Sequence, residues 1–205
     1  MKTDFLNSQT KANLMKAFAG ESQARNRYTF AKLSALEQNM YVLSEVFRFT
    51  AEQEEQHAKI FYELMQEASG GEINITADYP VEVTDSLQKL LDSSANNENA
   101  EAESIYPQFA EIAKQEGFTK ASSKFELIAE IERIHRKRFE YFGALLRDDK
   151  LHKSDKSERW LCLNCGHIHE GTEAPMMCPV CSVQQGYFIR ESDAPFTWGG
   201  MVCQE

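Results

Sequence analysis

The sequence predicts a mostly α-helical protein: a four-helix bundle followed by a small cysteine-rich module of strands and loops. Only 5 Pro and 10 Gly occur among 205 residues, which favours long regular elements. Residues up to about 151 are rich in Ala, Glu, Lys, Leu and Gln, which are good helix formers. All five cysteines lie between Cys162 and Cys203. We therefore expect a bundle over residues 1–151, a polar linker over 152–158, and a cysteine-rich domain with a C-terminal tail over 159–205.

Four helices are expected in the first part of the chain. The first two run from about Thr10 to Gln38 and from about Met40 to Ala68. Residues 72–83 lack a helical period and form a long crossover. The third helix begins near Thr84, which supplies N-cap chemistry, is kinked at Pro107 and ends at Gly117. The fourth runs from about Thr119 to Arg147.

Each helix carries a stripe of apolar residues with 3,4 spacing, as expected for bundle helices. The long connection between the second and third helices indicates ferritin-like topology. Acidic and imidazole side chains interrupt the stripes at mid-length. These residues are Glu21 in the first helix, Glu54 and His57 in the second, Glu98 and Glu101 in the third, and Glu132 and His135 in the fourth.

Five carboxylates at one level of a core carry a negative charge that must be neutralised by positive charge. Burying an unpaired charge costs several kcal/mol or more, and like charges also repel. Two segments read Glu-x-x-His, and residues three apart on a helix face the same way. Two such helices and a glutamate from each of the others match the ligand set of di-iron and di-manganese bundles. The sequence thus predicts a dinuclear site, and Glu101, without a counterpart in the first half, predicts two inequivalent metals.

The cysteines predict a second metal site. Two Cys-x-x-Cys pairs, Cys162/Cys165 and Cys178/Cys181, are separated by 12 residues. Four thiolates suit either zinc or iron, and the spacing does not choose between them. Cys203 has no partner in this pattern, and we interpret it as a free thiol without a role.

The charge balance restricts the possible partners. The net charge is -10, which disfavours nucleic acid and anionic membranes as partners. No stretch approaches the ~20 apolar residues that span a bilayer, and the N-terminus lacks the apolar segment of a secretory signal. We therefore expect a cytoplasmic protein that binds neither nucleic acid nor membrane.

These motifs together resemble the rubrerythrin family over nearly the whole chain. The bundle motifs that carry the resemblance are Glu21-Ser22-Gln23-Ala24 with Tyr28, Glu54-x-x-His57, Glu98-x-x-Glu101 with Tyr106-Pro107, and Glu132-x-x-His135. The cysteine motifs resemble that family's rubredoxin-like domain. The resemblance implies iron in the four-cysteine site, a non-haem di-iron centre, and hydrogen peroxide reduction in oxidative-stress defence. It also implies dimers that bring the thiolate iron of one subunit near the di-iron site of the other.

The resemblance also implies roles for individual residues. Glu54 and Glu132 are similar to the bridging carboxylates, Glu21 to the terminal ligand of one iron, and Glu98 and His135 to the ligands of the other. Glu101 and His57 are similar to a pair that exchanges on the first iron, with the carboxylate bound when the iron is oxidised. Tyr28 and Tyr106 are similar to hydrogen-bonding partners of the ligands.

The expected function is a peroxidase that receives electrons through the rubredoxin-like centre from a reductase or redox protein the sequence does not identify. We expect a homodimer or a higher homo-oligomer. One alternative is iron oxidation and storage in a ferritin-like shell. A second is a non-enzymatic adaptor stabilised by metal, with zinc in the cysteine site.

Overall fold

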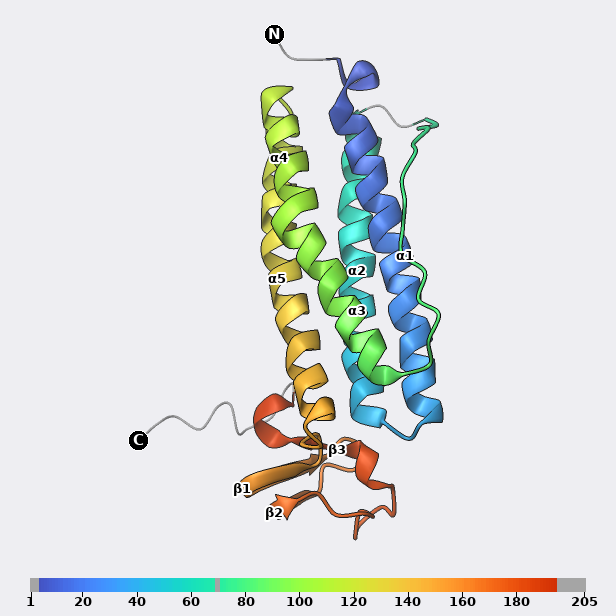
Figure 1. The fold of residues 1–205 in the computed structure, drawn as a ribbon. Helices are drawn as coiled ribbons and strands as arrows, with labels where there is room; N and C mark the ends of the chain where they lie inside the picture. Colours follow the sequence, from blue (N-terminus) through green and yellow to red (C-terminus); the bar gives the residue numbers. More distant parts are fainter. Residues whose placement is uncertain (1–3, 69–70, 195–205) are drawn as a thin grey trace, which may run out of the picture.

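The computed structural model describes residues 4–68 and 71–194 (Figure 1). Five α-helices form the bundle: α1 (Gln9–Glu37), α2 (Tyr41–Ala68), α3 (Leu87–Ala100), α4 (Tyr106–Gln115) and α5 (Thr119–Arg147). Helices α3 and α4 follow one another along one side of the bundle and together replace a single long helix. The ferritin-like four-helix architecture is therefore confirmed.

Side chains at the helix starts explain where two helices begin. The Ser8 hydroxyl accepts a hydrogen bond from the backbone of Lys11, and the carboxylate of Glu116 accepts from the amides of Gln9 and Thr10. These contacts satisfy N–H groups that have no partner within α1. For α3 the N-cap is Ser86, whereas the sequence placed the helix start at Thr84. The Thr84 hydroxyl instead accepts from the amide of Ser86.

The third predicted helix contains an irregular turn that the sequence placed at Pro107. The irregularity lies earlier, in a π-helical turn over Glu101–Ile105, where the amide of Tyr106 bonds the carbonyl of Glu101. A π turn adds one residue to the helix. Its effect is to shift the buried stripe, so that Ala102 and Tyr106 are buried while Ile105, a stripe position in the sequence, is 37% exposed.

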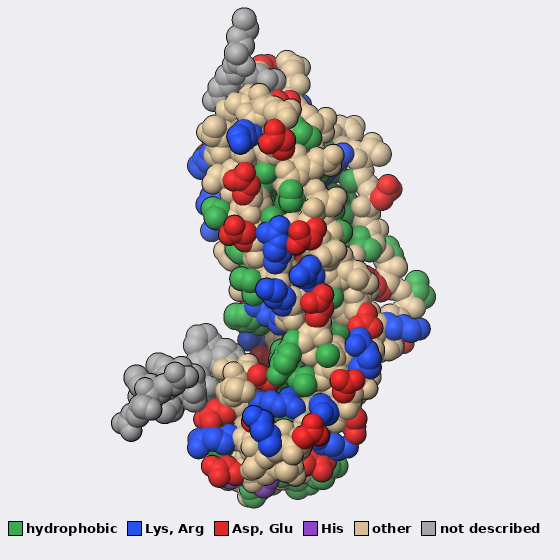
Figure 2. Space-filling model, turned by 60° about the vertical axis from the view of Figure 1, so that its left-hand side comes forward, with side chains coloured by type: hydrophobic (Ala, Val, Ile, Leu, Met, Phe, Trp, Pro, Cys, Tyr) green, Lys and Arg blue, Asp and Glu red, His purple; other side chains and the backbone are tan. Residues whose placement is uncertain are grey.

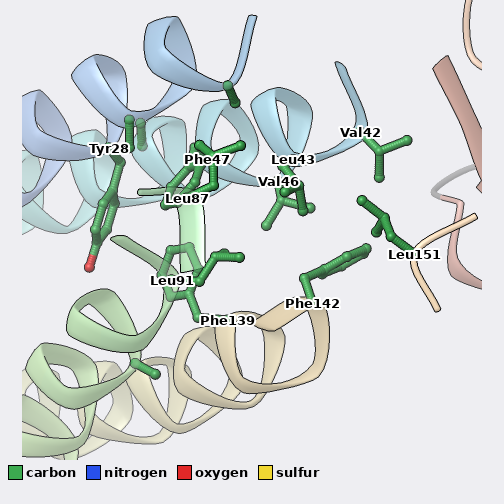
Figure 3. Packing of buried hydrophobic residues seen from close by; sticks show 14 of the residues in the cluster. Tyr28, Val42, Leu43, Val46, Phe47, Leu87, Leu91, Phe139, Phe142 and Leu151 are labelled. Atoms are coloured by element: carbon green, nitrogen blue, oxygen red, sulfur yellow. The ribbon is translucent and has the colours of Figure 1, made fainter. Parts of the chain in front are cut away.

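Two apolar clusters close the bundle on either side of its acidic middle. One includes Tyr28, Phe47, Leu91 and Phe139, whose side chains meet between the helices (Figure 3). The other is at the opposite end and includes Phe61 and Phe125, among others. Both clusters exclude water from the layer between them, so charges in that layer are screened very little.

The cysteine-rich part forms a small antiparallel sheet at one end of the bundle (Figure 1). Its strand order is β2 (Ile168–Glu173), β1 (Lys153–Cys162), β3 (Phe188–Arg190). The fully buried Trp160 packs with Phe188 beneath the sheet and donates to the carbonyl of Gly171. Most of residues 152–158, expected to be a linker, therefore lie in β1. The division into domains at that segment stays a prediction.

The sheet part docks closely on the turn between α1 and α2. A Cβ at Gly186 would lie 1.8 Å from the carbonyl oxygen of Asn39, so only glycine allows this approach. Next to it, the rings of Tyr41 and Tyr187 stack with centroids 4.1 Å apart. Ile189 joins the apolar cluster of the bundle. These contacts set the position of the four cysteines relative to the bundle.

Charged side chains of both signs share the surface with exposed apolar ones such as Phe30 and Ile134. On the face seen in Figure 2, basic and acidic side chains alternate over most of the molecule. None of the described helices combines the length and the apolar character that a bilayer span requires.

A half-buried histidine at the start of the sheet part predicts a pH dependence of stability. Burial, with a contribution from the nearby Arg190, lowers the pKa of His152 to about 4. An unfolded histidine binds a proton below about pH 6.5. Stability is therefore undiminished above that pH and is lost as the pH falls toward 4, by up to about 3 kcal/mol. Replacing His152 with glutamine should remove this part of the pH dependence, measured by urea unfolding at pH 7 and pH 5. An unchanged difference between the two pH values would contradict the assignment.

Candidate metal centres

The carboxylates and histidines predicted from the helix stripes meet in one buried layer. Glu21 comes from α1, Glu54 and His57 from α2, Glu98 from α3, and Glu132 and His135 from α5. Each of these six side chains is at most 4% exposed. The Glu-x-x-His spacing places both members of each pair on one helix face, as expected.

The six residues form two groups that share two carboxylates. The first contains Glu21, Glu54, His57 and Glu132, and the second contains Glu54, Glu98, Glu132 and His135. The ligand atoms in each group all lie within 4.8 Å of one another. This is the arrangement of two neighbouring metal sites with common bridging ligands.

The shared carboxylates offer one oxygen to each site. His57 Nδ1 lies 2.8 Å from Glu132 Oε1 and 3.1 Å from Glu54 Oε2. His135 Nδ1 lies 2.7 Å from Glu132 Oε2 and 2.9 Å from Glu54 Oε1. Each histidine thus faces a different oxygen of the same two carboxylates, which is the geometry that bridging requires.

Several atoms of this layer lie within ion-pair distance of one another but do not meet hydrogen-bond geometry. Among the described residues, Glu21 Oε2, Glu54 Oε1, both carboxylate oxygens of Glu132 and His135 Nδ1 are buried without a hydrogen-bond partner. Buried polar atoms are nearly always satisfied, and exceptions require an explanation. Oxygen and imidazole donors directed at common points fit divalent or trivalent metal ions.

Electrostatics in the metal-free protein lead to the same conclusion. Burial and the charge of Glu132 raise the pKa of Glu21, and burial and the charge of Glu54 raise the pKa of Glu98. Burial opposes protonation of His135, but the charges of Glu54 and Glu132 and the hydrogen bonds to both carboxylates together outweigh it and raise the pKa of His135 to about 9. Bound protons therefore neutralise part of the negative charge of this layer in the metal-free protein. Metal ions would displace these protons and neutralise the carboxylates directly.

Two tyrosines hold the outer carboxylates. The hydroxyl of Tyr28 donates to Glu98, and that of Tyr106 donates to Glu21. Both phenols are buried, and burial raises the pKa of each, so both remain protonated donors. Each tyrosine is thus placed to orient one terminal carboxylate, as a partner of a metal ligand does.

Sequence reasoning missed two residues beside the site. The side-chain oxygen of Gln53 lies 3.1 Å from His135 Nε2 and accepts a hydrogen bond from Arg138. Such a contact fixes the ring orientation of a histidine ligand. Gln53 directly precedes Glu54, and Arg138 lies three residues after His135, so helix spacing could have drawn attention to Arg138.

Glu101 occupies a different place from the other predicted ligands. It belongs to neither group and is half-buried at the π turn. Its carboxylate oxygen lies 3.8 Å from the position that a Cβ on Gly20 would take. Burial and the charges of Glu21 and Glu132 raise its pKa, which indicates that it lies close enough to interact with the acidic layer. In this structure His57, not Glu101, stands among the carboxylates of the first group.

The four predicted cysteines form the second centre. Their sulfur atoms lie within 4.8 Å of one another, with Cys162–Cys181 and Cys165–Cys178 separations of 3.7 Å. Backbone amides donate to sulfur in both turns, and the side chain of Asn164 with the amide of Val183 lowers the pKa of Cys181 to about 6. The site has the thiolate set of a closed tetrahedral centre. Cys203 lies outside the described residues.

The two cysteine turns share one backbone feature that their residues accommodate differently. In each, the residue after the second cysteine has a left-handed backbone: Gly166 with φ +79° and Ser182 with φ +61°. A left-handed conformation costs a non-glycine residue about 1–2 kcal/mol, which is partly offset by the greater freedom of glycine when unfolded. Ser182→Gly should therefore stabilise this part by about 0.5–1 kcal/mol. Thermal loss of the metal–thiolate absorbance measures this change. Ser157→Gly, in the extended strand β1, is the control and should not stabilise.

Comparison with known proteins agrees with this geometry. A family model described as "Rubrerythrin" matches residues 12–143, and one described as "Rubrerythrin, rubredoxin-like domain" matches residues 160–189. Rubrerythrin of Clostridium perfringens is 42% identical over 183 residues, covering 88% of this chain and 93% of that relative. Rubrerythrin of Nitratidesulfovibrio vulgaris is 37% identical over 181 residues, with the same coverage.

Solved structures show the same architecture. A mixed-valence state of nigerythrin matches with a TM-score of 0.59 and 29% identity, over 92% of this chain and 93% of that one. The bacterioferritin of Desulfovibrio desulfuricans, whose structure describes a di-iron site, matches with a TM-score of 0.63 and 25% identity, over 69% and 82%.

Together, the donor sets and the comparisons assign the metals. The Glu/His cluster is a di-iron site and the four-cysteine cluster is an iron site of the rubredoxin-like kind. The expected resemblance is thus confirmed over both parts of the chain. With these two iron centres and two matching family models, this chain belongs to the rubrerythrin family, a family of oxidoreductases.

Proposed function

We propose that this protein reduces hydrogen peroxide to water in the defence against oxidative stress, with electrons relayed through its four-cysteine centre. The observation that carries the proposal is the presence, in one chain, of two carboxylate-bridged metal sites and a separate four-thiolate site. The first can deliver two electrons at once, and the second passes single electrons without an open coordination position.

In this proposal Glu54 and Glu132 bridge the two sites, Glu21 and His57 complete one, and Glu98 and His135 complete the other. A ferrous pair held there would supply two electrons, which with two protons would convert hydrogen peroxide into two waters without release of a radical. Tyr28 and Tyr106 keep the terminal carboxylates in place through their hydroxyl hydrogen bonds.

Glu101 and His57 act as an exchanging pair in the proposed cycle. Hard carboxylate oxygen favours ferric iron, whereas the softer imidazole suits ferrous iron. His57 stands among the carboxylates of the first group, and Glu101 lies just outside it. The position of Glu101 on a π turn supports this role, since such turns often occur at functional sites.

Electron transfer points to a second subunit. The four-cysteine part packs on Tyr41, at the start of α2, and Glu54 lies thirteen positions further along the same helix. That is about 20 Å along the helix. We therefore propose a homodimer or higher oligomer in which the thiolate centre of one subunit serves the di-iron site of another. A cytoplasmic reductase or redox protein supplies the electrons.

Stopped-flow spectroscopy of the reduced, iron-loaded protein tests the proposal. Hydrogen peroxide should oxidise the di-iron centre at least about a hundred-fold faster than dioxygen does at equal concentration, since the latter is the poorer two-electron acceptor here. Oxidation by peroxide that is no faster than by dioxygen would refute the peroxidase assignment.

Iron oxidation and storage is the second candidate, favoured by the likeness to bacterioferritin. Storage requires a large hollow assembly and needs no thiolate relay. Light scattering together with iron uptake beyond the three ions of the two centres would support storage over peroxide reduction.

A further inference from the structure

A cavity of about 420 Å³ opens on the side of the bundle where the crossover passes α1. We call residues 72–83 the strap; Figure 1 shows this segment running along α1 between the ends of α2 and α3. Among the residues lining the cavity are Gly20 from α1, Tyr79 from the strap, and Glu101 and Tyr106 from the opposite wall. The cavity therefore lies between solvent and the side of the bundle that carries Glu101.

The inner wall of this cavity adjoins the acidic layer. Tyr106 donates its hydroxyl hydrogen to Glu21, a member of the first metal group. The carboxylate of Glu101 lies 3.8 Å from the position of a Cβ on Gly20, the residue before Glu21. Of four cavities along the described chain, none is lined by the clustered glutamates and histidines themselves, but this one is lined by Tyr106, which bonds one of them, and by Glu101.

Gly20 is unusual because it lies in the middle of the long helix α1. Glycine inside a helix lowers its stability relative to alanine, so its presence requires another reason. A Cβ at this position would lie 3.7 Å from a ring carbon of Tyr79 and 3.8 Å from the carboxylate of Glu101. A single methyl group would thus touch both, and a larger side chain would fill the space between them.

The strap is held over this space by polar contacts at two points. The hydroxyl of Tyr79 donates to the carbonyl of Lys16 at 2.8 Å. Three residues further along, Glu82 pairs with Arg27 at 2.8 Å, and both side chains are mostly buried. By contrast, Val81 and Val83 are 86% and 96% exposed, so the strap does not depend on apolar packing there. Tyr79 is therefore fixed as the outer wall of the gap beside Gly20.

We infer that this cavity is the route by which small oxidants reach the di-iron site, and that Gly20 and Tyr79 set the size of molecule that can pass. The inference rests on the proposed peroxide chemistry for its substrate. The geometry alone requires only that a small molecule enter between Gly20, Tyr79 and Glu101. The inference predicts that hydrogen peroxide passes this gap and that a hydroperoxide with a bulky organic group is excluded.

Azide binding to the oxidised, iron-loaded protein tests access without turnover, through the absorption band of the ferric–azide complex. Gly20→Val should slow azide association by about ten-fold or more, and Gly20→Ala by a few-fold. Gly143→Ala is the matched control: Gly143 is also buried in a helix, but its added Cβ would face Gln88, Asp92 and Leu91, away from this cavity. It should leave azide association unchanged. Iron content of each variant shows that the centre itself is intact.

Tyr79→Ala tests the effect of widening the gap, whereas the Gly20 variants narrow it. Tyr79 is far in sequence from every proposed ligand. Widening the gap should raise the rate with cumene hydroperoxide relative to hydrogen peroxide by about ten-fold.

The metal-free Gly20→Ala protein should melt no lower than wild type, because alanine favours the helix. If Gly20→Ala melts higher than wild type and also binds azide more slowly, the slower binding is caused by narrower access and not by a less stable fold.

Two results would overturn the inference: unchanged azide association in iron-replete Gly20→Ala and Gly20→Val, or an unchanged hydroperoxide preference in Tyr79→Ala. If Gly20→Val loses its iron, Gly20→Ala and Tyr79→Ala decide the question. The proposed function fails separately, if wild-type protein reacts with peroxide no faster than with dioxygen. The azide measurements still test the route in that case.

Discussion

Replacing Glu132 with glutamine is expected to abolish the iron pair of the bundle. Glu132 presents one oxygen to each site, 2.8 Å from His57 and 2.7 Å from His135, so its loss removes a ligand from both centres at once. An amide also cannot neutralise iron as a carboxylate does. Elemental analysis should find about one iron per chain instead of three, with the thiolate iron retained as an internal standard.

The same substitution should remove the stabilisation that iron provides. Iron present at about 1,000 times its dissociation constant stabilises the folded state by about 4 kcal/mol. In a chain of this length that corresponds to about 8–16 °C in melting temperature. Anaerobic melting with and without ferrous iron should show this difference in wild type and not in Glu132→Gln. Glu130→Gln, exposed on the same helix, is the control and should behave as wild type. Retention of the iron-dependent shift in Glu132→Gln would contradict the bridging role.

Replacing Cys165 with serine is expected to separate the two halves of the proposed cycle. Cys165 is exposed, whereas Cys162 and Cys178 are buried in the small core, so this position disturbs packing least. A hydroxyl is a harder and weaker ligand than a thiolate for this iron. The visible absorbance of the four-thiolate centre should therefore be lost or strongly altered.

The Cys165→Ser variant should lose only those reactions in which electrons must pass through the four-cysteine centre. Sustained peroxide reduction with an electron donor should fall by more than about ten-fold, while oxidation of the pre-reduced di-iron centre in a single turnover stays within about two-fold of wild type. Cys203→Ser should change neither rate, as expected of a thiol without a role. Equal loss of both rates in Cys165→Ser would mean that the thiolate centre supports the fold of the di-iron site and is not a relay.

Local pattern was sufficient to predict which side chains gather in the two clusters, apart from Glu101. The Glu-x-x-His pairs at Glu54 and Glu132 lie on single helix faces, so spacing alone predicted that each carboxylate and its histidine point the same way. Interruption of four apolar stripes at one level predicted that the helices meet there. The cysteine spacing predicted a tetrathiolate site in the same manner, because two short turns need no distant contact to form.

Other features depended on contacts between distant segments. Pro107 indicated an irregular helix, but the added residue is accommodated at Glu101–Ile105, where it turns Ala102 and Tyr106 inward. Residues 152–158 are polar and read as a linker, yet pairing with β2 makes most of them part of a strand.

The sequence by itself determined the helices, the ligand pairs and the two kinds of metal site, because periodicity and short spacings act within one element. Only the tertiary structure decided which oxygen of Glu54 and Glu132 faces which histidine, where Glu101 lies, and how the strap places Tyr79 beside Gly20. These arrangements depend on packing between segments tens of residues apart. The free energy of that packing is shared among many contacts and leaves no local pattern in the chain.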